Sequence, residues 1–292
     1  MKKVIIRVPC FNHEKYVGLC LESIAAQDYP HLEVIVVDDA STDGTADIAE
    51  GLCRRFGFLF QRNERNLGLP ATLNKMMGLV GDYDYVFSIA SDDIMAPSAI
   101  SAMVAAMERN PGHVGAYGDV MLINADGADL GLIRNDRTSG DLFEKVLFNE
   151  ISIPRTWFLW AAAAYRQFGS FDEKMSMEDS YVFAKMARLG PICYCGARIV
   201  SYRKHSGNTT ANTWLIYEAS CRLLESFHGE YFYPKLRRLY GSENFYLLSR
   251  SHKAEAWRHL PAALSRPFRR QFWAAWLNLC GFGFIVDRFI RK

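Results

Sequence analysis

The 292-residue chain lacks the short glycine-rich motifs that mark many nucleotide-binding and hydrolytic α/β enzymes. No GxGxxG motif follows the first predicted strand and no GxxxxGK[ST] motif occurs, so the dinucleotide fingerprint and the Walker phosphate loop are both missing. The GxSxG nucleophile elbow is absent as well. An α/β enzyme without such a loop must neutralise phosphate in another way, and a divalent cation held by carboxylates is one such way.

The cysteines give no sign of a disulfide framework or a zinc ribbon. There are seven, an odd number, and no CxxC pair occurs among them. Cys193 and Cys195 alternate in "PICYCGARIV", so they are expected on one face of a strand, as small core residues. The apolar run in "MKKVIIRVPC" is broken at Arg7 and again at Pro9, too early for the core of a signal peptide. We therefore expect a reducing, cytoplasmic setting.

Charge is nearly balanced overall but unevenly placed. The net charge of +2 indicates no polyanion partner, so we expect no nucleic acid to bind. Residues 250–292, however, carry nine Lys or Arg against two Asp or Glu. Within this tail Gln271–Val286 is uncharged, but its sixteen residues fall short of the roughly 20 that span a bilayer.

The basic tail has the pattern of a helix that lies on a membrane surface. Four apolar residues recur in it at helical spacing: Phe268, Phe272, Trp276 and Leu279. Such a face beside arginines is typical of an interfacial helix on anionic lipid. The alternatives are that this helix docks on the protein itself or on a partner in a homodimer.

The first part of the chain alternates strand and helix patterns. Five apolar runs predict strands: residues 3–9, 32–39, 58–63, 83–90 and 114–124. Four helical patterns separate them: residues 14–27, 43–56, 69–80 and 96–110. This order predicts an α/β fold with a mainly parallel, Rossmann-like sheet flanked by helices. In such sheets ligands bind beyond the carboxyl ends of the strands.

The rest of the chain is less regular at first and then helical. Residues 124–154 are polar and predict a loop-rich connection, residues 157–171 and 178–190 predict helices, and residues 192–205 predict a pair of strands. From residue 211 onward the pattern is helical. We expect two parts, an α/β domain over residues 1–210 and a helical region over residues 211–292 that ends in the basic aromatic tail.

Paired carboxylates follow two of the predicted strands, Asp38-Asp39 and Asp92-Asp93. Two unit charges about 4 Å apart repel by roughly 4 kcal/mol at an effective dielectric constant near 20. A chain accepts this cost more readily where a cation or a donor-rich ligand binds. The simpler interpretation, capping of the next helix, explains Asp43 well and the Asp38-Asp39 pair poorly.

Two more groups stand out near the end of the α/β part. Glu178-Asp179 falls in the first turn of a predicted helix, where the helix dipole alone favours acidic residues. His205 follows Arg203 and Lys204 in "SYRKHSGNT", and together they form a local anion-attracting group. A lone histidine is more often structural, so these groups gain weight only in combination with the strand-end carboxylates.

In their order these segments resemble family 2 glycosyltransferases of the GT-A fold, of the inverting type found in bacterial cell-surface polysaccharide synthesis. The resemblance covers roughly residues 3–210 and rests on six segments: "VIIRVPCFNHEKYVGLCLESIAAQ", "EVIVVDDASTDGT", "NLG", "SDD", "GSFDEKMSMED" and "YRKHSGNTT". The chain departs from the family where Ala90-Ser91 precede Asp92, since many relatives have another Asp there. The segment "NKMMGLV" also lacks the Ala-Arg-Asn that often follows the NxG turn.

The resemblance implies a nucleoside-diphosphate sugar lying across the strand ends, with UDP favoured over the guanosine and thymidine nucleotides. Asp39 would bond the base, Pro9, Phe11 and Asn12 would wall the nucleoside, and Asp92 would hold the ribose side. The whole set of implied nucleotide-sugar-binding residues is Pro9, Phe11, Asn12, Asp38, Asp39, Asn66, Gly68, Asp92 and Arg203.

The resemblance also implies a cation and a base. Asp93 and His205 would ligate Mg²⁺ or Mn²⁺, which would stabilise charge on the leaving diphosphate. Asp179 would act as the general base that takes a proton from the acceptor hydroxyl, and Glu178 would orient it or contact the sugar. A single displacement would invert the anomeric configuration.

The acceptor side is defined less sharply by the sequence. Trp157 and Trp160 are three residues apart and would share a face if their segment is helical, as acceptor contacts or as core residues. The implied acceptor is a glycan or lipid-linked glycan in surface polysaccharide or lipopolysaccharide synthesis, which suits peripheral attachment to the inner face of the plasma membrane.

Two other functions are alternatives. A sugar nucleotidyltransferase usually has a glycine-rich, basic loop after the first strand, and "PCFNHEKYV" is neither. A catalytically inactive nucleotide-sugar-binding protein is disfavoured by the retention of Asp93 and Asp179.

Overall fold

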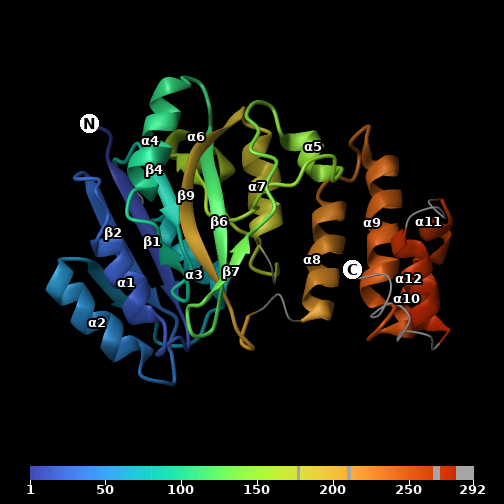
Figure 1. The fold of residues 1–292 in the computed structure, drawn as a ribbon, viewed down its shortest axis with the longest axis horizontal. Helices are drawn as coiled ribbons and strands as arrows, with labels where there is room; N and C mark the ends of the chain where they lie inside the picture. The colour runs from blue at the N-terminus through green and yellow to red at the C-terminus, as the bar shows by residue number, and fades with distance from the viewer. Residues whose placement is uncertain (80, 176–177, 209–211, 266–269, 281–292) are drawn as a thin grey trace. The chain divides into compact units, whose positions relative to one another are not determined.

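The computed structural model describes the chain except for residues 80, 176–177, 209–211, 266–269 and 281–292 (Figure 1). The chain divides into two compact units. The first comprises Met1–Lys174 and Glu178–Ser206, and the second comprises Met175–Met177 and Gly207–Lys292.

The first unit contains a nine-stranded mixed sheet in the order β3-β2-β1-β4-β8-β6-β9-β5, with β7 beside β6. Its strands are β1 (Val4–Cys10), β2 (Leu32–Asp38), β3 (Leu59–Arg62), β4 (Tyr85–Ser88), β5 (Ile94–Met95), β6 (Gly115–Asn124), β7 (Asp129–Leu132), β8 (Leu159–Ala161) and β9 (Ile192–Lys204). The four strands β3, β2, β1 and β4 are parallel, as the sequence predicts, and β8 runs antiparallel to both β4 and β6.

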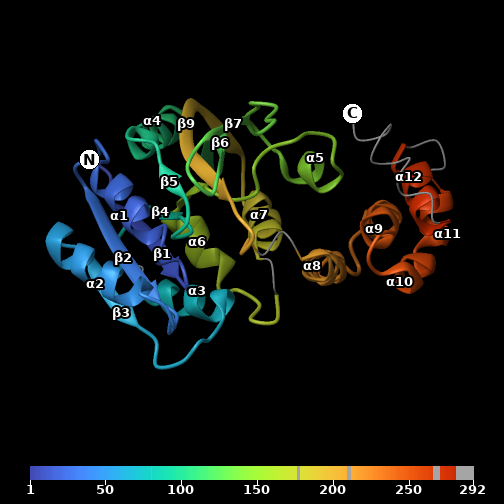
Figure 2. The same cartoon turned by 60° about the horizontal axis from the view of Figure 1, so that its bottom comes forward.

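Helices cover both faces of this sheet (Figure 2). The helices of the first unit are α1 (Val17–Ala25), α2 (Thr45–Phe56), α3 (Leu69–Met77), α4 (Ala99–Arg109), α5 (Phe143–Leu147), α6 (Ala162–Phe168) and α7 (Asp179–Ala187). Apolar side chains of α1, α2 and α4 form one core cluster with alternate residues of β1, among them Ile6 and Val8. Arg7 lies between these two residues and therefore faces the opposite side of the sheet. There it contacts Tyr165 of α6.

The aromatic segment from residue 157 is not one helix, contrary to the pattern. Leu159–Ala161 forms β8, and α6 begins only at Ala162. β8 fills the gap between β4 and β6, because Trp160 lies opposite Val86 on one side and Gly115 on the other. A Cβ atom at residue 115 would lie 2.5 Å from the Trp160 ring, so glycine is required there. Sheet pairing thus overrides the helix propensity of the adjacent alanines.

The predicted strand pair over residues 192–205 is also wrong, because β9 is one strand of thirteen residues. Its register against β6 shifts between the pairs Tyr117–Tyr194 and Asp119–Arg198. Gly196 lies in this irregularity with a φ of 80°. It therefore belongs to a bulge and not to a hairpin. In the predicted loop-rich connection over residues 124–154, the structure adds β7 and α5.

The second unit is helical, as expected beyond residue 211. Its helices are α8 (Thr213–Glu225), α9 (Tyr233–Leu248), α10 (Lys253–Arg258), α11 (Leu260–Leu264) and α12 (Arg270–Leu279). In the part of the chain that the structure describes, no helix combines the length and the apolarity that crossing a bilayer requires.

The apolar face assigned to a membrane-surface helix is packed within the second unit where it is described. Phe272 of α12 stacks on Phe245 of α9 with ring centroids 6.0 Å apart, and Trp276 meets Trp257 of α10 at 5.7 Å. Docking on the protein, one of the alternatives, therefore describes α12. Phe268 and the terminal segment 281–292 lie outside the described residues.

Candidate active site

The two aspartates that follow β4 have different surroundings. Asp93 is 1% exposed, and both of its carboxylate oxygens accept hydrogen bonds of 3.0 Å. One donor is the indole nitrogen of Trp157 and the other is the backbone nitrogen of Arg203. Burial, together with the adjacent charge of Asp92, raises the pKa of the Asp93 carboxyl. Asp93 therefore connects the loop after β4 to Arg203 in β9 and to Trp157, which precedes β8.

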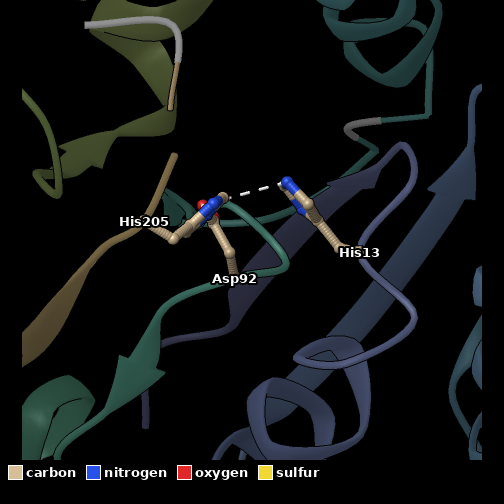
Figure 3. Close-up of side chains that lie close together, drawn as sticks. All are labelled: His13, Asp92 and His205. Atoms are coloured by element: carbon tan, nitrogen blue, oxygen red, sulfur yellow. Dashed lines mark hydrogen bonds and ion pairs between the residues drawn. The ribbon is translucent and has the colours of Figure 1, made fainter. Parts of the chain in front are cut away.

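Asp92 instead faces two histidines that come from distant parts of the chain. Its Oδ2 atom lies 2.9 Å from Nε2 of His205, which follows β9, and 3.9 Å from Nε2 of His13, which follows β1. Figure 3 shows the His205 ring next to the Asp92 side chain and the His13 ring facing them across a short gap. One ligand atom from each of the three side chains lies within 4.8 Å of the other two.

Neighbouring groups hold both imidazoles in place. Nδ1 of His13 lies 2.8 Å from the Ser91 hydroxyl, and the His13 backbone nitrogen donates to the Thr45 hydroxyl at 2.7 Å. The His205 ring lies 4.9 Å from the ring of Tyr16, which in turn carries the Arg203 guanidinium at 4.9 Å. Burial lowers the pKa of His13, which favours the neutral ring that binds metal ions.

The cluster fits a divalent cation. Bonds of about 2.0–2.2 Å from a metal to nitrogen and oxygen place two ligands about 3.0–3.4 Å apart, depending on the coordination geometry. The separations of 2.9 Å and 3.9 Å from Oδ2 of Asp92 lie just below and just above this range. Among the described residues the cluster includes Asp92 and not Asp93, which favours Asp92 over the predicted Asp93 as the carboxylate ligand.

At the end of β2, Asp39 organises the loop that carries the NxG turn. Its carboxylate accepts from the Asn63 side chain at 2.7 Å and from the backbone nitrogens of Leu67 and Gly68 at 2.9 Å. Gly68 has a φ of 84°, a conformation that favours glycine, and its nitrogen also donates to the Asn66 side chain at 2.9 Å.

Asp38 is fully buried and makes bonds within its own loop. Its carboxylate accepts from the backbone nitrogen and the hydroxyl of Ser41, and the Arg62 guanidinium lies 3.4 Å away. Asp38 thus stabilises the loop that follows β2, while Asp39 stabilises the loop of Leu67 and Gly68.

The exit of β1 is bonded to the exit of β2. Pro9 lies in β1 opposite Val37. Asn12 has a φ of 54°, and its side-chain oxygen accepts from the Thr42 nitrogen at 2.9 Å. Phe11, which the sequence places against a nucleoside, is 39% exposed. The two loops therefore form one polar rim beside the Asp92 cluster, because His13 directly follows Asn12.

Arg203 is 1% exposed and holds the backbone of the loop that carries Asp92. Its Nε donates to the backbone oxygen of Asp92 at 2.9 Å, and its Nη1 donates to the oxygens of Asn124 and Ala125 at 3.3 Å and 3.0 Å. These contacts fix the backbone of the acidic loop to β6 and β9.

Glu178 and Asp179 lie at the start of α7 and line a cavity of about 60 Å³. Burial and the neighbouring Asp179 raise the pKa of Glu178 to about 8. Burial raises the pKa of Asp179 to about 6, and a hydrogen bond with the Thr156 side chain partly offsets that shift. The other lining residues are Arg7, Leu73, Ser88, Arg155, Thr156, Trp157, Phe158, Trp160, Tyr165, Phe171 and Val182.

Both tryptophans predicted for the acceptor side line this cavity, although not on one helical face. Trp157 is 9% exposed and has a φ of 60°, an unusual conformation for a bulky residue. Trp160 is 7% exposed and stacks on Phe158 with centroids 4.7 Å apart. Trp157 also donates to Asp93, so one side chain joins the cavity to the acidic loop after β4.

Two side chains of this region were not predicted as site residues from the sequence. His13 is one, although its position directly after Asn12 at the exit of a parallel strand was a usable signal. Arg7 is the other: it is 1% exposed, donates to the Ser88 hydroxyl at 2.7 Å and bonds the Tyr165 hydroxyl. A charged residue inside the apolar run "VIIRVP" marks such a buried polar contact.

In α/β folds ligands bind at the carboxyl ends of the strands, and titratable groups with shifted pKa values cluster at functional sites, so this region is a candidate active site. The chain matches the family described as "Glycosyl transferase family 2" over residues 5–168. It belongs to this family and is a glycosyltransferase, which confirms the predicted class.

Relatives and solved structures agree with this assignment. An uncharacterized glycosyltransferase of Haemophilus influenzae is 29% identical over 225 residues, 72% of this chain and 68% of that protein. Poly(ribitol-phosphate) β-N-acetylglucosaminyltransferase TarS of Staphylococcus aureus is 30% identical over 131 residues, which cover 44% of this chain but only 22% of TarS.

Among solved structures, residues 1–349 of S. aureus TarS in complex with UDP-GlcNAc superpose with a TM-score of 0.68 at 18% identity. The match covers 99% of this chain and 91% of that one. The mannosyltransferase PcManGT from Pyrobaculum calidifontis, in complex with GDP-Man and Mn²⁺, gives 0.63 at 14% identity, covering 100% and 88%. These likenesses confirm the predicted GT-A fold.

Proposed function

We propose that this protein is an inverting, metal-dependent glycosyltransferase that moves a sugar from a UDP-sugar to a hydroxyl group of a glycan or lipid-linked glycan. One observation carries the proposal. Trp157 lines the cavity of Glu178 and Asp179 and also binds Asp93, next to the Asp92 cluster. This contact links the candidate cation cluster to the carboxylate pair and supports assigning both to one site.

The donor assignment is supported by the rim at the ends of β1 and β2. Asp39 orders the loop of Leu67 and Gly68 and would meet the base, while Phe11 and Asn12 would wall the nucleoside. TarS was solved with UDP-GlcNAc and PcManGT with GDP-Man, so proteins of this fold hold either base. We favour UDP because the relatives of higher sequence identity include TarS.

Asp92 and His205, the pair in direct contact, would hold the divalent cation. When bound, Mg²⁺ or Mn²⁺ would offset the negative charge that develops on the leaving diphosphate. PcManGT was solved with Mn²⁺. Asp93 would keep the loop in position through Trp157 and the Arg203 backbone.

Asp179 would act as the general base. With a pKa of about 6 it is ionised at neutral pH, whereas Glu178, with a pKa of about 8, retains its proton and can donate a hydrogen bond. The acceptor oxygen would pass its proton to Asp179 and form a bond to the anomeric carbon, while the bond to the diphosphate breaks. This single displacement inverts the configuration, and base assistance of this kind contributes about 10²–10⁴-fold.

The acceptor would enter beside Trp157 and Trp160, whose rings form part of the cavity wall. We extend the proposal to surface polysaccharide or lipopolysaccharide synthesis, with peripheral attachment to the membrane through the basic residues of the tail, since Phe272 and Trp276 of α12 pack within the second unit. Sedimentation of the full-length protein with anionic liposomes at low salt tests the attachment, and a protein that stays in solution would contradict it.

The function is tested by thermal shift with UDP, GDP and TDP, each with and without Mn²⁺, followed by assays of UDP release from UDP-GlcNAc. A ligand at 100 times its Kd adds about 2.7 kcal/mol to stability. We expect UDP with Mn²⁺ to give the largest shift. A larger shift with GDP or TDP rejects the UDP donor. Binding of UDP without its release from UDP-GlcNAc when glycan acceptors are supplied indicates an inactive binding protein. Production of a nucleotide-sugar from a nucleoside triphosphate indicates a nucleotidyltransferase.

A further inference from the structure

His13 contacts Ser91 through Nδ1 and directs its other ring nitrogen, Nε2, toward Asp92. Its Nδ1 lies 2.8 Å from the Ser91 hydroxyl, while its Nε2 lies 3.9 Å from Oδ2 of Asp92. When Nδ1 donates its proton to Ser91, the lone pair of the neutral ring falls on Nε2. Histidines that bind metals are commonly fixed in this way by a partner on the other ring nitrogen.

The two imidazoles are arranged around the carboxylate and not merely stacked on each other. The rings of His13 and His205 lie nearly perpendicular, at 88°, with centroids 5.9 Å apart. Both present Nε2 to the same Asp92 oxygen (Figure 3). A histidine that served only to brace the loop would need its contact with Ser91 and its backbone bond with Thr45, but no Nε2 directed at a carboxylate.

We propose that His13 is a third protein ligand of the divalent cation and that the site consequently selects ions that bind nitrogen well, Mn²⁺, Co²⁺ and Zn²⁺, over Mg²⁺. This inference rests on the proposed function, because it concerns the cation of that same site. Two imidazoles and one carboxylate suit borderline transition metals, whereas Mg²⁺ prefers oxygen ligands and retains its waters. Among such sites affinity rises from Mn²⁺ to Co²⁺.

The experiment is a titration of the full chain with Co²⁺ alone, followed by visible absorption and calorimetry, and repeated with Mg²⁺. Wild-type protein is expected to bind Co²⁺ more tightly than Mg²⁺. His13→Ala and His13→Asn are expected to weaken Co²⁺ binding by at least about tenfold, since even outer-shell changes cost about 10–100-fold. His13→Asn keeps a polar group near Ser91, and melting in EDTA reports whether each variant is folded.

His31→Asn is the matched control, because His31 is exposed and lies outside the cluster. It should bind Co²⁺ as wild type does. Unchanged Co²⁺ affinity in folded His13 variants, with binding lost in Asp92→Asn, overturns the role of His13 and leaves the proposed function intact. A wild-type protein that binds neither Co²⁺ nor Mn²⁺, even with UDP present, overturns the metal dependence of the proposed function itself.

A second measurement needs no variant. Pulsed electron paramagnetic resonance of Cu²⁺ bound to the wild-type protein distinguishes one coordinated imidazole from two. We expect two, and one would overturn the proposal.

Discussion

The first unit holds two sets of acidic side chains, Asp92 on one hand and Glu178 with Asp179 on the other, in different surroundings. At the end of β4, Asp92 lies against the nitrogens of His13 and His205. At the start of α7, Glu178 and Asp179 lie in a cavity walled by Trp157, Phe158 and Trp160, where burial raises both pKa values. The first arrangement suits a cation and the second suits a proton. Environment, and not residue type, separates the two roles.

The largest expected effect comes from removing the proton acceptor. Asp179→Asn should lower turnover by about 10²–10⁴-fold, because the amide cannot take the proton of the acceptor hydroxyl. Donor binding should be nearly unchanged, since Asp179 lies in the cavity and not in the cation cluster. UDP release and calorimetry with UDP measure the two quantities. Asp82→Asn, on the exposed loop before β4, is the control. Near-native turnover of Asp179→Asn would show that another group is the base.

The next effect separates the adjacent aspartates. Asp92→Asn should weaken Mn²⁺ binding by at least about 10–100-fold, the range that even outer-shell changes reach. Asp93→Asn should retain most of that affinity but lower the free energy of unfolding by about 1–3 kcal/mol, because one buried donor loses its acceptor. Metal titration and urea unfolding of both variants give the comparison. The reverse order would restore Asp93 as the ligand, as the sequence predicts.

Activity should also report the environment of Asp179. Because its pKa is raised to about 6, the base becomes protonated as the pH falls through that value. We expect kcat/KM to decrease about tenfold per pH unit below the pKa, as for any single required ionised group. The profile is measured with a buffer series at constant ionic strength. A flat profile down to pH 5 would place the base in a solvated environment and remove the contrast with Asp92.

The smallest effect is on stability. The folded-state pKa of Glu178 is raised from 4.5 to about 8, so the folded protein holds this proton more tightly than the unfolded chain. The contribution is fully present below about 4.5 and is lost as the pH rises through about 8. Asp179 acts in the same sense between 3.8 and about 6. The other charged or titratable groups that line the cavity are Arg7, Arg155 and Tyr165.

Wild-type protein should therefore lose stability between pH 5 and pH 8, and Glu178→Gln should lose less, because glutamine does not titrate. Urea unfolding at both pH values measures the difference. An equal loss in the two proteins would mean that Glu178 is solvated in the folded state.

The sequence anticipated much of the sheet and the family but not the pairing of individual side chains. The runs that became β1, β2 and β4 were readable because buried parallel strands are apolar on both faces. β8 was missed, because a three-residue strand between two others is defined by its neighbours and not by its own pattern. The single strand β9 was predicted as two strands, whereas the structure has a bulge at Gly196 that shifts the register against β6 without ending the strand.

In the candidate site, too, the positions of the acidic residues could be predicted, whereas the contacts of their side chains could not. The sequence by itself determined that acidic residues end two strands and begin α7, since these positions follow from local periodicity. Only the tertiary structure decided that Asp92 meets His205, 113 residues away, and that Asp93 turns to Trp157. Adjacent residues in a loop have no fixed period, so the direction of each side chain is set by the strands packed around it.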